Sequence, residues 1–373
     1  MTDFRPLGLY LHIPFCKAKC AYCDFYSLAR SEEKMDAYCA ALKSDLAHWA
    51  DAAAPYTVDT VYFGGGTPSY LGAKRLCALL ETVFSHYRVA PGAEITFEAN
   101  PDSARDADAL RMLRGAGFDR ISLGAQSFDD AELRGIGRIH TADEITQAVD
   151  AARRAGFDNV SLDLIYGLPA QTMTRWRENL ASAVALAPKH LSCYGLKVEE
   201  GTPLYLRRES AQLPDDDAQA DFYLETVRFL AQHGYEQYEI SNFARPGYAS
   251  RHNLKYWTLQ PYLGFGPGAH SDFGGRRFAA ARDLDAYLAG KAVLSEDAAV
   301  SHRERQREYF MLGLRTVRGV CAAETDTDFA AAEAVLRQCA SHGLAECRDE
   351  RWRLTPQGFL VSNAVIARVL DAI

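Results

Sequence analysis

Residues 10–25 read Y-L-H-I-P-F-C-K-A-K-C-A-Y-C-D-F, an apolar run that leads into three cysteines, Cys16, Cys20 and Cys23. Three neighbouring thiols cannot all be paired in disulfides, and a tetrahedral zinc site needs a fourth ligand close by. A [4Fe-4S] cluster can take three thiolates and leave its fourth iron open to another ligand. The spacing C-x3-C-x2-C therefore predicts such a cluster, while an incidental group of cysteines and a zinc knuckle completed by a distant residue stay as alternatives.

The composition is that of a globular protein. The chain has 373 residues, of which 48% are hydrophobic and 24% charged, which allows a large core and a second, smaller domain. Its formal net charge of -8 argues against a nucleic-acid surface, which needs a concentrated basic field. No stretch reaches the ~18 apolar residues of a membrane span, and the start M-T-D-F-R-P has no secretory pattern. We therefore expect a cytoplasmic protein whose other cysteines are reduced.

Short apolar runs alternate with helical patterns over residues 7–198. Apolar residues recur at helical spacing in 38–49, 76–83, 145–152 and 176–184. The expected strands between them are 7–13, 58–63, 94–98, 120–125, 159–166 and 190–196, and 235–240 is a seventh candidate. Such β-α units predict a parallel sheet that is either open and doubly wound or curled into a barrel.

The unusual polar residues of this region fall at the ends of the expected strands. Cys16 follows the first strand, Gly64-Gly65-Gly66-Thr67-Pro68 the second, Glu98 closes the third, Gln126 the fourth, and Gly195 ends the sixth. Ligands of barrels and of open parallel sheets bind at the carboxyl ends of the strands. The glycine run lacks the lysine of a phosphate loop, so it indicates close approach to other polar groups of a ligand.

Two carboxylates are expected in apolar surroundings. Glu98 closes a strand and Asp163 lies inside one, where an unpaired charge is unfavourable. Asp163 has two open interpretations, contact with a cationic ligand or an ion pair with Arg138 or Arg120 that only holds the barrel. Tyr22, in the cysteine loop, could stack on a base or pack within the loop.

The pattern changes after residue 241. Residues 242–299 are rich in glycine and aromatic residues and are predicted to be a connecting loop that lies over the barrel. Residues 300–373 predict helices at 305–317 and 326–342, a hairpin that turns at Asp349-Glu350 and a last helix at 355–370. We expect three parts, 1–241, 242–299 and 300–373, the last a mostly helical, winged-helix-like accessory domain. Its ten Arg and ten acidic residues balance, which favours packing over DNA binding.

Further motifs make a resemblance specific. H-I-P-F-C, G-G-G-T-P-S, R-I-S-L-G-A-Q-S-F, S-L-D-L-I-Y-G-L-P and Y-E-I-S-N-F-A follow one another along the chain. Together they resemble the oxygen-independent coproporphyrinogen III oxidase superfamily of radical S-adenosylmethionine (SAM) proteins. The resemblance implies an α/β fold, an incomplete (β/α)6 TIM barrel with a C-terminal accessory domain, and SAM bound at the open iron of a [4Fe-4S] cluster held by Cys16, Cys20 and Cys23. It implies these SAM-site residues: Tyr10, Tyr22, Gly65, Gly66, Thr67, Glu98, Gln126, Arg138, Asp163 and Gly195.

Two departures separate this chain from the oxidases of that superfamily. The oxidases have a further cysteine two residues after the third cluster ligand, where this chain has Phe25, and an N-terminal extension that this sequence lacks. Together with the motif H-N-x-x-Y-W at 252–257, these departures resemble the sister branch, the HemW-type haem chaperones. That branch implies binding of haem and its transfer to an acceptor haemoprotein. The alternative is an oxidase that forms protoporphyrinogen IX from coproporphyrinogen III by radical decarboxylation.

The motif offers groups that suit haem. The candidates are His252, Asn253, Tyr256 and Trp257. A neutral imidazole is a common axial ligand of haem iron, and aromatic rings pack on a porphyrin face, although the same residues would equally form a hydrogen-bonded loop anchor. Competing ligands are His12 and His270, and the propionates could pair with Arg245, Arg251 or Lys255. Expected partners are haem or a related porphyrin, an acceptor haemoprotein and an electron donor, with at most a peripheral contact to membrane haemoproteins.

Overall fold

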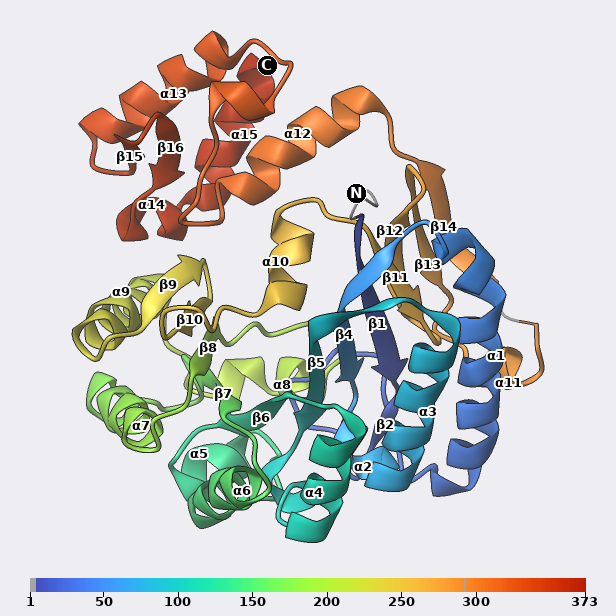
Figure 1. Cartoon of the computed structure of the whole chain (residues 1–373). Coiled ribbons are helices and arrows are strands. Elements are labelled where there is room, and N and C mark those ends of the chain that lie inside the picture. The colour runs from blue at the N-terminus through green and yellow to red at the C-terminus, as the bar shows by residue number, and fades with distance from the viewer. Residues whose placement is uncertain (1–4, 292) are drawn as a thin grey trace.

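The computed structural model describes residues 5–291 and 293–373. Its main sheet has 12 strands in the order β14-β13-β12-β11-β1-β4-β5-β6-β7-β8-β10-β9, and the strands from β11 to β8 run parallel. The six strands expected from the sequence are β1 Pro6–Ile13, β4 Thr57–Gly65, β5 Val89–Ala99, β6 Arg120–Gln126, β7 Asn159–Tyr166 and β8 His190–Gly195. The predicted barrel of six β-α units is therefore confirmed (Figure 1).

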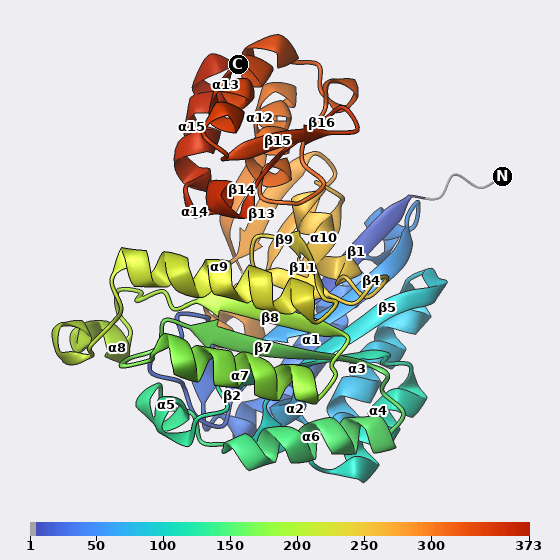
Figure 2. The same ribbon diagram turned by 90° about the vertical axis from the view of Figure 1, so that its left-hand side faces the viewer.

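Long helices connect these strands and cover the outer face of the sheet (Figures 1 and 2). They are α1 Met35–Ala53, α3 Ala73–His86, α4 Ala107–Ala116, α6 Ala142–Arg154, α7 Met173–Ala185 and α9 Asp216–Gln232. Three shorter helices follow carboxyl ends of strands: α2 Pro68–Leu71, α5 Asp130–Gly135 and α8 Pro203–Leu206. No helix in the described ranges is long and apolar enough to cross a membrane.

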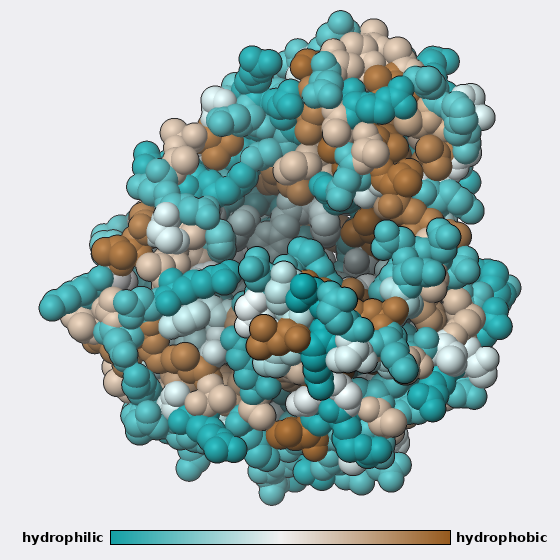
Figure 3. Space-filling model, turned by 180° about the vertical axis from the view of Figure 1, so that it is seen from behind, coloured by the Kyte–Doolittle hydropathy of each residue, from teal (hydrophilic) through white to brown (hydrophobic). Residues whose placement is uncertain are grey.

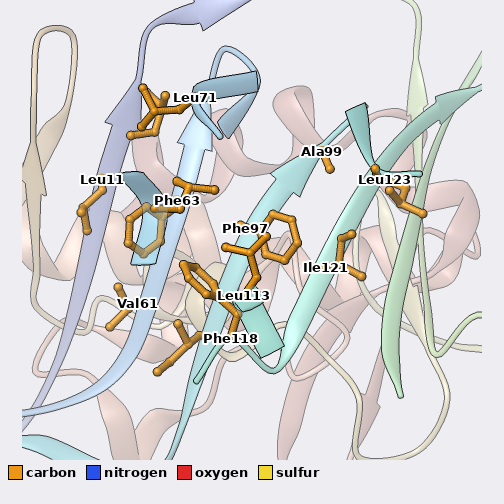
Figure 4. Packing of buried hydrophobic residues seen from close by; sticks show 14 of the residues in the cluster. Leu11, Val61, Phe63, Leu71, Phe97, Ala99, Leu113, Phe118, Ile121 and Leu123 are labelled. Carbon is orange, nitrogen blue, oxygen red and sulfur yellow. The ribbon is translucent and has the colours of Figure 1, made fainter. Parts of the chain in front are cut away.

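The two faces of the parallel strands differ in chemistry. Figure 4 shows residues of the outer face, such as Val61, Phe97 and Ile121, packed with Leu113 of α4 in one buried cluster. Burying each large apolar side chain stabilises the fold by about 1.5–3 kcal/mol. The alternate residues, such as Tyr62 and Ser122, face the inside of the barrel, because successive side chains of a strand point to opposite faces. The inner face is therefore polar, although parallel strands are usually apolar on both faces.

The prediction of a loop over residues 242–299 is wrong. The segment contains β10 Asn242–Ala244, α10 Arg251–Trp257, β11 Tyr262–Phe265, β12 His270–Phe273, β13 Arg276–Ala280, α11 Leu284–Leu288 and β14 Leu294–Ala299. Its glycines gather in tight turns between short strands, as at Gly274-Gly275, where both φ angles are positive. The helix forms because Ser250 caps it, accepting from the Asn253 N–H, and no Gly or Pro interrupts the next seven residues.

This segment continues the barrel sheet on both edges. Strand β10 pairs with β8 and with β9 Glu236–Glu239, the seventh candidate strand, while β11 pairs with β1. Helix α10 lies beside the first residues of the strands, since Gly8 in β1 and Thr60 in β4 contact its side chains. It therefore stands at the amino ends of the strands, opposite the end at which the cysteine loop emerges (Figure 1).

The C-terminal residues form a second core. They fold into α12 His302–Gly313, α13 Phe329–Ser341, β15 Ala345–Arg348, β16 Arg351–Leu354, α14 Pro356–Leu360 and α15 Ser362–Ala372. Phe310, Leu336, Trp352 and Ile366 pack together in it. The predicted hairpin turn at Asp349-Glu350 is confirmed, with φ angles of 49° and 60°. The mostly helical, winged-helix-like domain is thus present as predicted (Figure 2).

Candidate functional site

The cysteine loop begins at the carboxyl end of β1. Its strand β2 Phe15–Cys16 pairs with β3 Leu28–Ala29, which closes the loop that carries Cys20 and Cys23. Cys16 is buried and accepts a hydrogen bond from the Thr67 hydroxyl at 3.5 Å, while the other two thiols are partly exposed. Burial raises the pKa of the Cys16 and Cys23 thiols, so metal binding must displace their protons.

The three thiols line one cavity and offer the three thiolates that a [4Fe-4S] cluster can take. No group of three or more His, Cys, Asp or Glu side chains within residues 5–291 and 293–373 is placed to hold one metal ion. A [4Fe-4S] cluster binds each thiolate through a different iron, so its ligands need not meet at one point.

The glycine run at the carboxyl end of β4 holds the backbone of the cysteine loop. The Gly66 N–H donates to the Ile13 carbonyl and the Thr67 N–H to the Phe15 carbonyl, both at 2.8 Å. A Cβ on Gly66 would lie 2.7–2.9 Å from backbone atoms of Phe15 and Ile13. Gly66 is therefore needed for packing against the loop, whereas the sequence predicted only the close approach of a ligand.

One cavity of about 400 Å³ joins the loop to the inside of the barrel. Cys16, Cys20 and Cys23 line it, and all the SAM candidates but one also lie in its wall: Tyr22, Gly65, Gly66, Thr67, Glu98, Gln126, Arg138, Asp163 and Gly195. Tyr10 lies behind the wall, where its hydroxyl contacts His12 Nδ1 at 3.1 Å and its ring stacks on Tyr62. The fold therefore gathers these candidates, which are spread over positions 16 to 195 of the sequence, around one space.

Glu98 and Asp163, two of the acidic residues that line the cavity, accept hydrogen bonds from neighbouring strands. Glu98 accepts from the Tyr62 hydroxyl at 2.8 Å and the Gly65 N–H at 3.1 Å, and burial raises the pKa of its carboxyl to about 7. Asp163 accepts from the Ser192 and Ser122 hydroxyls at 2.7 and 3.2 Å, and burial raises its pKa as well. No ion pair of Asp163 with an arginine occurs in the described parts of the chain.

Arg138 connects the cysteine loop to the cavity. Its Nη1 donates to Asn100 Oδ1 at 2.9 Å and its Nη2 to the Gly124 carbonyl at 3.1 Å. Asn100 donates to Thr67 Oγ1, the group that contacts Cys16, so a chain of hydrogen bonds links the guanidinium to the thiol. Within the described ranges, Arg138 Nε is buried without a partner. A ligand carboxylate fits this donor, as SAM would require.

Gln126 is held in an unusual conformation at the end of β6. Its φ angle is +66°, and the register between β6 and β7 shifts just before it. Left-handed backbone is unfavourable for residues other than glycine, and such strain is often found at binding sites. The side chain is buried in the wall of the cavity.

The four haem candidates all lie on helix α10, and its turns direct their side chains to different surroundings. Asn253 lines the cavity, whereas His252 is only 1% exposed and stacks on Tyr62. His252 Nδ1 lies 2.8 Å from the Thr60 hydroxyl, and Nε2 lies 2.8 Å from the Tyr256 hydroxyl. Burial lowers the pKa of His252 to about 3, so its imidazole is neutral. Both nitrogens are therefore engaged with the protein, and iron ligation by Nε2 requires the Tyr256 hydroxyl to leave.

Several residues of the site were missed by sequence reasoning. Tyr62, Ser122 and Ser192 hold the two carboxylates, and Asn100 holds Arg138. A signal was available in R-I-S-L-G-A-Q, where every second residue is polar or glycine. In a parallel strand this alternation predicts that one face lines a polar interior.

Comparisons with known proteins agree with this architecture. The model of the Radical SAM superfamily matches residues 10–183, and that of the HemN C-terminal domain matches residues 300–361. The heme chaperone HemW of Escherichia coli is 37% identical over 98% of each chain, and that of Bacillus subtilis is 34% identical over 97% of this chain and 98% of its own. Among solved structures, coproporphyrinogen III oxidase (HemN) of Escherichia coli superposes with a TM-score of 0.86 at 26% identity, covering 99% of this chain and 91% of the oxidase.

The partial barrel, the three-cysteine loop at its first strand and the cavity between them define a radical SAM protein. Identity of about a third over nearly full length then decides the branch. The chain belongs to the HemW family.

The binding of SAM is expected to depend on pH through Glu98. SAM carries a positive sulfonium, which favours the ionised carboxylate, and burial raises the pKa of Glu98 to about 7. We expect SAM affinity to rise by up to about tenfold per pH unit below pH 7 and to level off above it. Equilibrium dialysis at a series of pH values measures this, and Glu98→Gln should flatten the slope.

The stability of the ligand-free protein should fall as the pH rises, whereas the affinity for SAM should increase. Because the pKa of folded Glu98 lies above that of an unfolded glutamate, its contribution to stability is present at low pH and is lost as the pH rises through about 7. Glu98→Gln should therefore gain stability over the wild type above pH 7. If the affinity for SAM depended on pH equally in the wild type and in Glu98→Gln, a group other than Glu98 would be the one that titrates.

Proposed function

We propose that this chain binds haem, holds it near a [4Fe-4S] cluster and SAM, and passes it to an acceptor haemoprotein in the cytoplasm. The observation that carries the proposal is the full-length likeness to proteins named heme chaperone HemW, at 33–37% identity in the relatives compared. Phe25 supports it, because an exposed aromatic residue lies at the cavity where the oxidases of the resembling superfamily have a cysteine.

The residues of the cavity fit the two cofactors that the radical SAM superfamily implies. Cys16, Cys20 and Cys23 would hold the cluster. Arg138 Nε offers a buried donor to the SAM carboxylate, while Glu98 and Asp163 offer charge to its sulfonium and acceptors to its ribose hydroxyls. The cluster and SAM together supply one-electron chemistry when bound. The chain's own contribution is to orient SAM and to exclude water from it.

A second candidate function is coproporphyrinogen III oxidation. The likeness to the solved HemN oxidase, with a TM-score of 0.86 over 99% of this chain, favours it. The same barrel can serve both functions, since function depends on the site and not on the fold. Partners in either case are a porphyrin and an electron donor, and the carrier adds an acceptor haemoprotein, which can be a membrane protein met at its surface.

A haem titration tests the carrier function. Anaerobically reconstituted protein should bind one haem per chain, with a Soret band that saturates at that ratio. Addition of apomyoglobin as a generic acceptor should then move the haem to the acceptor, as its own Soret band reports. Wild-type protein that binds no stoichiometric haem would remove the basis of this proposal.

His252 remains our predicted iron ligand, and Tyr256 provides the matched control. His252→Ala should shift the Soret band and weaken haem retention, because the ligand is lost. Tyr256→Phe should leave the band in place and strengthen binding by about two- to tenfold, since it removes a competing hydrogen bond worth about 0.5–1.5 kcal/mol. An unchanged Soret band in His252→Ala would make the imidazole an anchor of helix α10 instead.

A further inference from the structure

Arg120 is a buried cation that the fold leaves without a partner. It is the first residue of β6, it is 1% exposed, and its side chain lines the cavity of the site. Its Nε and Nη1 atoms are buried and have no hydrogen-bond partner in residues 5–291 and 293–373, and no ion pair reaches it there. A guanidinium that is removed from water without a counter-ion is strongly unfavourable, so a fold that keeps one usually has a ligand for it.

The two carboxylates whose charge favours that of Arg120, Glu94 and Asp163, accept hydrogen bonds from other groups. Glu94 accepts from the backbone N–H groups of Arg251 and His252, both at 3.0 Å, and so caps helix α10. Asp163 accepts from the two serine hydroxyls described above. Neither carboxylate lies within ion-pair distance of Arg120, although both favour its charge at longer range.

Arg120 stands in a row of three unpartnered polar groups. In the register of the sheet, Thr96 of β5 lies opposite Arg120, and Asn159 of β7 lies opposite it on the other side. Thr96 Oγ1 and Asn159 Oδ1 are also buried without a hydrogen-bond partner in the described ranges. Thr96 shares the face of β5 that carries Glu98, and Asn159 shares the face of β7 that carries Asp163, so all three point to the inside of the barrel. We call them the polar row.

The polar row has the chemistry of a carboxylate site. The guanidinium offers a charged fork of N–H donors, the hydroxyl of Thr96 offers one more, and the amide of Asn159 can turn to present its NH2 group. A charged fork beside neutral donors binds a carboxylate with two or more hydrogen bonds. Of the row, Arg120 lines the cavity, which also reaches Asn253 of helix α10, so a ligand anchored on this guanidinium would lie against the motif proposed for haem. Figure 3 shows that the face opposite to that of Figure 1 is hollowed near its centre, where a large ligand could enter.

The cations first considered for the haem propionates are already engaged. Arg251 donates to the carbonyls of Asp59 and Gly92, at 2.9 and 2.8 Å. Lys255 is 2% exposed and pairs with Asp59 at 2.6 Å. Arg245 lies over the Tyr235 ring. These three cations are thus held by the protein, whereas Arg120 is not.

We propose that the polar row of Thr96, Arg120 and Asn159 binds a carboxylate inside the barrel, namely one propionate of the haem cargo. The inference rests on the proposed haem-carrier function and adds the place where the cargo is anchored. The same carboxylate chemistry is present in the methionine end of SAM, so the experiment separates the two sources.

The first arm changes the ligand and leaves the protein intact. Wild-type protein, reconstituted anaerobically, is titrated with haem and with haem dimethyl ester, whose propionates cannot carry charge. We expect the ester to bind about ten- to a hundredfold more weakly, the size of a lost charge-assisted hydrogen bond. Equal affinity for the two ligands would overturn the inference while leaving the carrier function intact. A wild-type protein that binds neither ligand would instead contradict the carrier function, and the inference with it.

The second arm changes the row. Arg120→Met should weaken haem binding to the level of the ester and should leave the affinity for the ester unchanged. Thermal unfolding of the variant without ligand shows whether it folds. Arg120→Lys, which keeps the charge, provides a second variant if the first does not fold. A loss of SAM affinity with unchanged haem affinity would assign the carboxylate to SAM and overturn the proposal.

Discussion

The variant Cys16→Ala is expected to contain no [4Fe-4S] cluster after anaerobic reconstitution. With three thiolates available in the loop, loss of one leaves two irons of the cluster without a protein ligand. Cys16 is also the buried member of the three, and it receives the Thr67 hydroxyl, so water cannot simply replace it. Iron and sulfide analysis should fall from about four of each per chain to near zero.

Cys347→Ala is the matched control for this change. Cys347 is an exposed thiol in the β15–β16 hairpin of the C-terminal domain, far in sequence from the cysteine loop. It should keep the full iron and sulfide content of the wild type. If Cys16→Ala kept its cluster, or if a cysteine outside the loop proved necessary, the three-cysteine assignment would be wrong.

Asp163→Ala is expected to lower the affinity for SAM by about ten- to a hundredfold, the size of a lost charge-assisted hydrogen bond. Asp163 lines the cavity from the middle of β7, and two serine hydroxyls hold its carboxylate there. Asp163→Asn, which keeps the shape but not the charge, should show how much of the loss comes from charge.

Asp158→Ala is the control for that experiment. Asp158 precedes the same strand but is exposed at its other end, where it contacts Lys189 and Tyr248. It should bind SAM as the wild type does. Unchanged SAM affinity in a folded Asp163→Ala protein would leave Asp163 as a structural carboxylate only.

Much of the barrel could be predicted because its signals are local. Strand β7 has the bounds expected from its sequence, 159–166, since polar and apolar residues alternate from 159 to 164 and turn residues border the stretch on both sides. The carboxyl-end rule then located Cys16, Glu98, Gln126 and Gly195, all of which line the cavity. The hairpin at Asp349-Glu350 was equally readable, because turn residues separate two short β-rich runs.

The remaining features depend on partners that are distant in the sequence. Strand β11 is short and becomes a strand only because β1, more than 200 residues earlier, offers it an edge, as in the pairing of Gly8 with Tyr262 (262 − 8 = 254). Arg120 looked like a possible partner of Asp163, and only the structure shows that serines occupy that carboxylate. His252 looked like an available imidazole, yet its two nitrogens contact Thr60 and Tyr256.

Phe25 stands at the position where this chain differs from the oxidases, and it lies at the cavity. It is 63% exposed and lies in the wall of the cavity, on the loop that carries the three cysteines. A thiol at this position could exchange protons or electrons with a ligand, whereas a phenyl ring offers only an apolar contact. The ring therefore suits a site that holds a porphyrin without reacting with it.

One anaerobic measurement tests the carrier function against the oxidase most directly. Reconstituted wild-type protein is incubated with SAM, a reductant and coproporphyrinogen III, protoporphyrinogen IX is quantified, and the same preparation is titrated with haem. We predict one haem bound per chain and no protoporphyrinogen IX above the level of a Cys16→Ala control. Turnover of coproporphyrinogen III without stoichiometric haem binding would contradict the account and make this chain an oxidase.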